Sequence, residues 1–315
     1  MNRQKLLLFI ALAMGFSFLG HILPPLFLDD GNLFLPFMQL MLYSWGPAFA
    51  VITLKKFIRK ESLNGLGWNR RHFSLRWIAL AIALPFAVVL GSLGLIFLLG
   101  NVMHLPGFGE VILEKTNLTS AKYFFFFQTP DGLDAGIWSW FSLGMMPPEM
   151  WNLVVLILVV GTIGGATFSL LYLVGQEVGF RGFLLQETRS LGFVGSNFII
   201  GGLFGLWQLP QLFLNNPQVQ GFDLLLSILG TVGFAIAVSF PAAWLAIRTR
   251  SVYASATFLG VLFNVAPISQ FFTYSANPLL GSAQGFVGML VLLTITFCIL
   301  RWDPRVGEDY DKWVF

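Results

Sequence analysis

Charge is what this sequence lacks most. Only 10% of its 315 residues are charged and 56% are hydrophobic, whereas roughly 25% of the residues of a typical soluble protein are charged. This composition favours one membrane-embedded unit over two soluble domains. Cysteine is also scarce, and the single Cys298 excludes an internal disulfide and a site built from several thiolates.

Histidine is nearly absent as well. The three histidines are His21, His72 and His104, and none follows position 104. The second half of the chain therefore offers no imidazole to zinc or to an attacking water. We expect no metal site and no bound cofactor.

Long apolar segments are what the chain has instead, each long enough to cross a bilayer, which takes about 20 residues. They are Leu6–Leu28, Leu33–Leu54, Trp77–Val102, Leu153–Val174, Ser196–Leu214, Phe222–Ile247, Val252–Phe272 and Gly285–Leu300. They predict an all-α polytopic membrane protein with a bundle of about eight transmembrane helices. The first segment resembles a signal peptide, but its length favours a retained helix.

The basic residues predict how the bundle is oriented. With the N-terminus inside, all of the 18 Lys and Arg residues except Lys115 and Lys122 fall on the inner side. Such an asymmetry predicts that both termini are cytoplasmic. The basic pI of 9.1 then reflects topology and contact with anionic membrane lipid rather than nucleic-acid binding. We expect a multi-pass protein of a bacterial inner membrane or an equivalent energy-transducing membrane.

Three regions follow along the chain. Residues 1–150 hold three helices, a basic inner loop (Lys55–Arg76) and a long aromatic outer segment (Met103–Trp151). Residues 151–275 form the core helices, and 276–315 the last helix and a cytoplasmic tail. The inner loop is expected to lie along the lipid headgroups, with setting the topology as its simplest role. The outer segment is expected at the membrane interface, and a lid or a docking surface for another membrane protein is the sharper alternative.

Small residues indicate where helices pack closely. Glycines spaced four apart occur at Gly161 and Gly165, at Gly201 and Gly205, and at Gly281 and Gly285. Such spacing supports a compact bundle and identifies no particular partner helix.

Polar residues interrupt the apolar pattern at three places. Gln176, Glu177 and Arg181 follow the fourth apolar segment, and Glu177 and Arg181 share a helical face. Gln208 and Asn264 each lie about 18 Å into their helices. Ionisable groups at membrane depth mark a functional site or a buried structural pair. For Glu177 to meet the two amides, the fourth helix must be tilted or bent.

These residues form a pattern that is similar to the CPBP family, the intramembrane proteases of CAAX prenyl and bacteriocin processing. That family carries Glu-Glu-x-x-x-Arg, then Phe-x-x-x-His, then His-x-x-x-Asn on successive helices. This chain has Gln176-Glu177-x-x-x-Arg181, Phe204-x-x-x-Gln208 and Gly260-x-x-x-Asn264. The resemblance covers about Val155 to Val265.

The resemblance implies a site in which the first Glu activates water and two His and the Asn complete the site. Here the corresponding positions hold Gln176, Gln208 and Gly260, while Glu177, Arg181 and Asn264 are retained. An amide is not a useful base near neutral pH, and glycine supplies no side chain.

Three hypotheses follow. The leading one is a pseudoprotease that binds or scaffolds a membrane partner, a hydrophobic peptide or a lipid-like ligand. The second is an active CAAX-type endopeptidase that uses Glu177 as its base, although Arg181 one turn away makes that carboxylate a poor base. The third is an accessory subunit of a larger membrane complex.

Overall fold

The computed structural model describes residues 3–29, 31–32, 34–68, 74–112, 150–215 and 219–312. Its long helices are α1 (Arg3–Ile22), α2 (Phe34–Ile52), α3 (Leu75–Ile96), α6 (Met150–Ala166), α9 (Gly192–Asn215), α10 (Gly221–Thr249), α11 (Val252–Val265) and α13 (Phe286–Trp302). Shorter helices are α7 (Leu170–Glu177), α8 (Leu185–Glu187), α12 (Ile268–Phe271) and α14 (Val306–Asp311). The π-helical segments are η2 (Thr53–Ile58), η3 (Phe97–Val102) and η4 (Val178–Leu184), and the 3₁₀ turns are η1 (Pro24–Leu26) and η5 (Arg189–Leu191).

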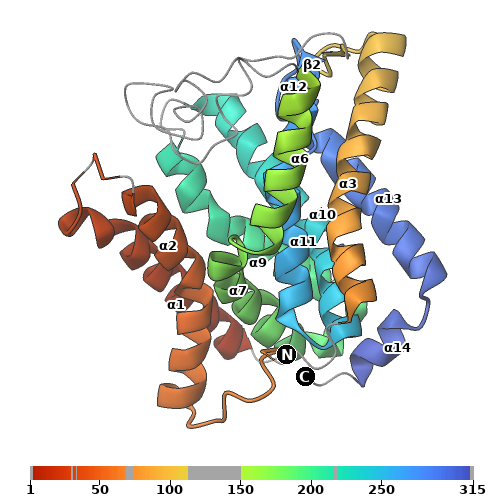
Figure 1. The fold of residues 1–315 in the computed structure, drawn as a ribbon. Helices are drawn as coiled ribbons and strands as arrows, with labels where there is room; N and C mark the ends of the chain where they lie inside the picture. The colour runs from red at the N-terminus through yellow and green to blue at the C-terminus, as the bar shows by residue number, and fades with distance from the viewer. Residues whose placement is uncertain are drawn as a thin grey trace.

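Each of the eight predicted apolar segments corresponds to a helix or to consecutive helices (Figure 1). Within the described ranges, six helices are long and apolar enough to cross a membrane. The helices Leu158–Ala166 and Leu170–Glu187 pass the same test only as a pair, which is bent by 51° and is either a broken span or a re-entrant loop. Helix α13 is a shorter apolar helix. The prediction of an all-α polytopic membrane protein is confirmed.

The first helix ends earlier than predicted, at Ile22 rather than Leu28. Pro24 and Pro25 have no backbone N–H, so they cannot continue the hydrogen-bond pattern of α1. The chain forms the 3₁₀ turn η1 there instead.

Helix α11 lies at the centre of the bundle. It contacts α3, α6, α7 and α10. The span Val252–Phe271 contains α11, and 78% of its apolar stretch is buried inside the protein. In the other five uninterrupted spans the buried share is at most 44%. Helices α1 and α2 pack against each other on one side, and α3 and α13 lie on the other (Figure 1). Residues on α11 are therefore placed to meet side chains from most of the core.

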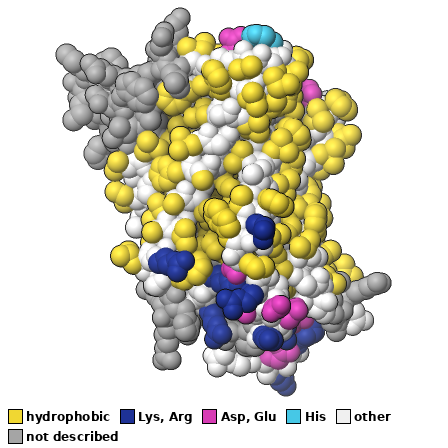
Figure 2. All heavy atoms as spheres, turned by 90° about the vertical axis from the view of Figure 1, so that its right-hand side faces the viewer, with side chains coloured by type: hydrophobic (Ala, Val, Ile, Leu, Met, Phe, Trp, Pro, Cys, Tyr) yellow, Lys and Arg dark blue, Asp and Glu magenta, His cyan; other side chains and the backbone are white. Residues whose placement is uncertain are grey.

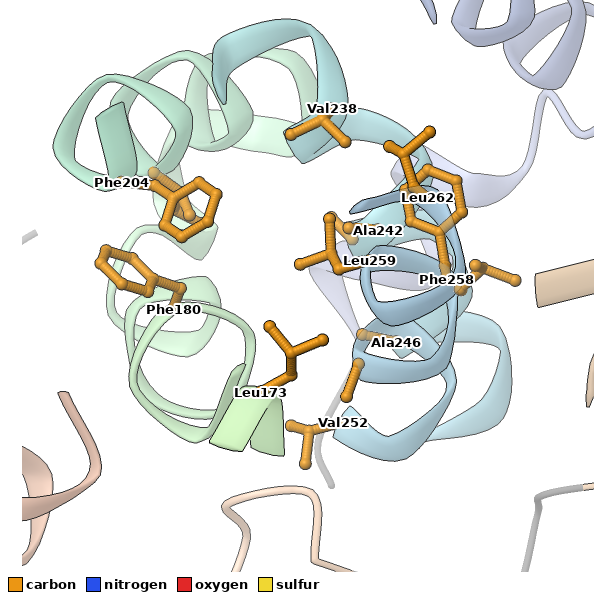
Figure 3. Close-up of a cluster of buried hydrophobic side chains, with 14 of the residues drawn as sticks. Leu173, Phe180, Phe204, Val238, Ala242, Ala246, Val252, Phe258, Leu259 and Leu262 are labelled. Atoms are coloured by element: carbon orange, nitrogen blue, oxygen red, sulfur yellow. The ribbon is translucent and has the colours of Figure 1, made fainter. Parts of the chain in front are cut away.

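The core around α11 is filled by apolar side chains from four segments. Figure 3 shows Phe180 of η4 and Phe204 of α9 facing each other across from Leu259 of α11. The two phenylalanine rings are in edge contact with centroids 5.0 Å apart. This packing joins the segment that follows Glu177 to the neighbouring helix.

The two ends of the bundle differ in charge. Both chain termini lie at the same end (Figure 1), and most Lys and Arg side chains on the visible face gather toward that end below an apolar band (Figure 2). This is the arrangement that the charge asymmetry of the sequence predicted. At the opposite end, strand β1 (Glu110–Val111) pairs antiparallel with β2 (Thr273–Tyr274). The aromatic residues between Tyr123 and Trp140 of the outer segment lie outside the described residues. The lid or docking role suggested for that segment therefore stays a prediction.

An inner clamp fastens the C-terminal end of α10 to the chain after α13. We use this name for Trp244, Arg248, Asp303 and Asp309. Arg248 Nε donates to Asp303 Oδ2 at 2.6 Å and Trp244 Nε1 donates to the same oxygen at 2.8 Å, while a second Arg248 nitrogen pairs with Asp309. Burial opposes the charge of Asp303, but the hydrogen bonds from Arg248 and Trp244 outweigh it and lower the pKa of Asp303.

Asp303→Asn should destabilise the protein by about 2 kcal/mol at pH 7, because charge-assisted hydrogen bonds to Arg248 are lost. Since the pKa of Asp303 is lower in the folded state, this stabilisation is complete above the ordinary aspartate value of about 4. It is lost as the pH falls through the folded value. Thermal unfolding in detergent at pH 7 and at acidic pH measures both effects.

The matched control is Glu308→Gln on α14, an exposed carboxylate whose replacement should leave the unfolding temperature unchanged. Equal effects of the two substitutions at pH 7 would contradict the clamp.

Candidate functional site

The broken helix places the first motif. The chain bends by 51° between Ala166 and Leu170, so the fourth apolar segment is bent, one of the two arrangements considered from the sequence. The hydrogen bonds of Asn264 go to Ser169 and Gly260. The Oγ of Ser169, which is buried at the bend, accepts a hydrogen bond from Asn264 Nδ2 at 3.1 Å and one from the Tyr172 hydroxyl at 3.0 Å. Asn264 Nδ2 also donates to the Gly260 carbonyl at 2.7 Å. Asn264 therefore braces the bend from α11.

Glu177 and Arg181 form a salt bridge inside the bundle. Arg181 Nη1 lies 2.6 Å from Glu177 Oε1, and both side chains are 0% exposed. The guanidinium also lies over the Phe204 ring, 5.0 Å from its centroid. The attraction between the two charges and the cation–π contact with Phe204 offset part of the free energy that both side chains lose when they leave water.

Several polar atoms of this pair are not satisfied within the described part of the chain. Glu177 Oε2 and Arg181 Nε and Nη2 are buried without a hydrogen-bond partner, and so is Gln176 Nε2. Ser255 of α11 lies beside the Glu177 carboxylate, but its hydroxyl donates to the Val252 carbonyl at 2.9 Å. The site is therefore richer in unpaired donors than in acceptors.

Glycines allow α2 and the inner loop to press against this segment. A Cβ on Gly175 would lie 2.7 Å from Trp45, one on Gly179 would lie 2.4 Å from Pro47, and one on Gly182 would lie 2.6 Å from the Leu66 carbonyl oxygen. Such distances are shorter than real Cβ contacts. The motif is thus enclosed on the face that carries its glycines.

The most consequential contact is a crossing of α6 and α11 at two glycines. A Cβ on Gly260 would lie 2.2 Å from the Gly165 carbonyl oxygen and 3.1 Å from Leu173 Cδ1. A Cβ on Gly165 would lie 2.6 Å from the Gly260 carbonyl oxygen. The sequence indicated close packing at Gly161 and Gly165, and the structure supplies the partner, α11. Backbone of α6 thus fills the space that a side chain at position 260 needs.

The remaining predicted position, Gln208, is half-buried on α9. Its neighbour Trp207 is buried and donates from Nε1 to Ser17 Oγ at 2.8 Å. The carbonyl of Trp207 accepts from the Tyr43 hydroxyl at 2.5 Å. Sequence reasoning missed Ser17, Tyr43, Ser169 and Ser255, since isolated hydroxyls in apolar segments carry no spacing signal.

This fold and site define a multi-pass helical membrane protein with paired polar motifs buried between its core helices. Residues 147–266 match the Rce1-like family, described as Type II CAAX prenyl endopeptidase Rce1-like. The matched range contains all six motif positions named above, and the match agrees with the resemblance that those motifs indicated. No curated protein matches the chain.

Gly165→Ala and Gly260→Ala should each destabilise the protein by about 1–3 kcal/mol, because the added methyl groups meet backbone atoms that cannot move aside independently. Thermal unfolding in detergent measures the loss. Gly164→Ala is the matched control, since a Cβ there has nothing within 4 Å. It should be neutral or slightly stabilising, and a loss as large as that of Gly165→Ala would contradict the crossing.

Glu177→Gln should destabilise the protein by about 3–5 kcal/mol, because it leaves the buried Arg181 charge without a partner. The double variant Glu177→Leu with Arg181→Met should recover most of this stability, since it removes both charges.

Glu187→Gln provides the comparison on the same stretch of chain, because its ion pair with Lys5 is partly exposed. It should cost less than about 1 kcal/mol. A double variant as unstable as Glu177→Gln would show that the pair does not act as a unit.

Proposed function

We propose that this protein is a proteolytically inactive member of the CAAX protease family that binds or scaffolds a membrane partner, a hydrophobic peptide or a lipid-like ligand. The observation that carries the proposal is the crossing at Gly165 and Gly260. The family's second histidine position has no imidazole, and helix backbone occupies the space beside it.

The other family positions support the same conclusion. Peptide hydrolysis needs a base that takes a proton from water. Gln176 is an amide at the position of the family's catalytic Glu, and Gln208 is an amide at the position of its first His. Glu177 is fully buried and paired with Arg181, so it is held away from water and neutralised. Its role is to stabilise the bundle.

The retained scaffold favours a binding role. Large hydrophobic side chains are exposed along the outside of the spans, for example Phe18, Phe198 and Phe297, which suits contact with lipid acyl chains and with apolar partners. The charge asymmetry favours a bacterial inner membrane or an equivalent energy-transducing membrane with the basic end toward the cytoplasm. Purification in mild detergent, followed by mass spectrometry, identifies partners that remain bound.

The purified protein should not cleave prenylated CAAX peptides or transmembrane peptides above the rate without protein, as followed by mass spectrometry. Gln176→Glu with Gln208→His should not produce cleavage either, because position 260 still has no imidazole. Adding Gly260→His should lower stability, since its Cβ would meet the Gly165 carbonyl oxygen.

Folding of each preparation is checked by thermal unfolding, so that an unfolded variant is not scored as inactive. Cleavage by the unaltered protein that Glu177→Gln abolishes would establish the active-endopeptidase alternative instead.

A further inference from the structure

A short strap from the inner loop crosses the inner end of the candidate site. We use this name for Gly65-Leu66-Gly67. Both glycines have φ of +77°, a backbone conformation that side chains rarely adopt. The Leu66 side chain between them is 1% exposed, although most of the loop around it is at the surface.

The strap joins the segment that carries Arg181 to the start of α11. On one side, Gln186 Nε2 donates to the Gly65 carbonyl, and the Leu66 carbonyl lies against Gly182, one residue after Arg181. On the other side, Val252 N donates to the Gly67 carbonyl at 3.0 Å. Val252 begins α11 one turn before Ser255, which lies beside Glu177. The strap thus contacts both η4 and the start of α11.

Both groups that donate hydrogen bonds to the strap, Gln186 Nε2 and Val252 N, have another partner available when the strap leaves. Gln186 Nε2 also donates to the Gly182 carbonyl at 2.5 Å, so it keeps a partner in its own helix when Gly65 leaves. The Val252 N–H belongs to the first turn of α11, where an amide can bond to water instead. The strap contributes backbone carbonyls and the Leu66 side chain to these contacts.

Arg181 directly precedes Gly182, the residue that the Leu66 carbonyl contacts, and this adjacency gives an opening of the strap a consequence. Arg181 Nε and Nη2 and Gln176 Nε2 are buried donors without a partner among the described residues. Unpaired buried donors attract water or a hydrogen-bond acceptor such as a peptide carbonyl or a carboxylate. We propose that Gly65-Leu66-Gly67 is a displaceable strap that seals this donor-rich site from the inner side of the membrane. Its release opens the site to water and to ligands with acceptor groups.

The test is the reactivity of a reporter thiol one helical turn from the strap's hydrogen bond at Val252. Cys298→Ser removes the chain's single cysteine, and Ser255→Cys places a thiol at a position that is 0% exposed. A charged, membrane-impermeant methanethiosulfonate is added to membrane vesicles of each orientation, and labelling is followed by mass spectrometry. With the strap intact, labelling should be slow from both sides.

Two independent changes should release the strap. Leu66→Ala removes most of the buried side chain, and Gly182→Ala adds a methyl group where the Leu66 carbonyl lies. Each should raise the labelling rate about tenfold from the inner side only, because each raises the population of locally open states.

The matched controls change the same residue types elsewhere. Leu292→Ala removes a fully buried leucine from α13, and Gly202→Ala adds a methyl group on α9 with nothing within 4 Å. Neither should change labelling. Thermal unfolding confirms that each variant is folded, and Gly182→Ala carries the test if Leu66→Ala does not fold.

Labelling that stays at the intact-strap rate in the folded strap variants would overturn the proposal. So would an equal rise in the controls. No substrate enters the measurement, so its outcome is independent of whether the protein cleaves peptides.

Discussion

The backbone contact between Gly165 and Gly260 sets the distances at the centre of this bundle. Because neither residue has a side chain, α6 and α11 approach more closely than helices that carry Cβ atoms at their crossing. The approach brings Ser169, just beyond α6, to 3.1 Å from the Asn264 amide, and that hydrogen bond braces the bend before α7. The direction of α7 determines where Glu177 lies. One crossing of two glycines therefore positions the site's charged residue.

The buried ion pair is stable only while both charged side chains are present and water is excluded from them. A carboxylate or a guanidinium alone at this depth is strongly unfavourable, whereas their mutual attraction grows as water is excluded. Arg181 also lies over Phe204, so the pair ties η4 to α9. Glu177 lies beside Ser255 and so links the pair to α11. Glu177 and Arg181 therefore have a structural role that does not depend on the chemistry of the neighbouring Gln176.

Hydropathy predicted the spans because an apolar segment in a bilayer satisfies its backbone only as a helix. The spacing of Glu177 and Arg181 also predicted that they can neutralise each other, because residues four apart on a helix are neighbours on one face. The bend at Ser169 was not predictable in position, because it is braced by Asn264, a residue distant in sequence. Gly165 was visible as a small residue, but only tertiary structure shows that it meets Gly260. Leu66 gave no signal, since a single leucine in a surface loop is ordinary.

Glycine at position 260 has two consequences for this bundle. It supplies no imidazole, and it admits the backbone of α6 into the space beside it. A histidine placed there meets the Gly165 carbonyl oxygen, so accommodating its side chain requires the two helices to separate. Their separation would stretch the Asn264 hydrogen bond to Ser169 and disturb the bend that positions Glu177. The packing at this crossing therefore leaves no room for a side chain at position 260 while the bend stays in place.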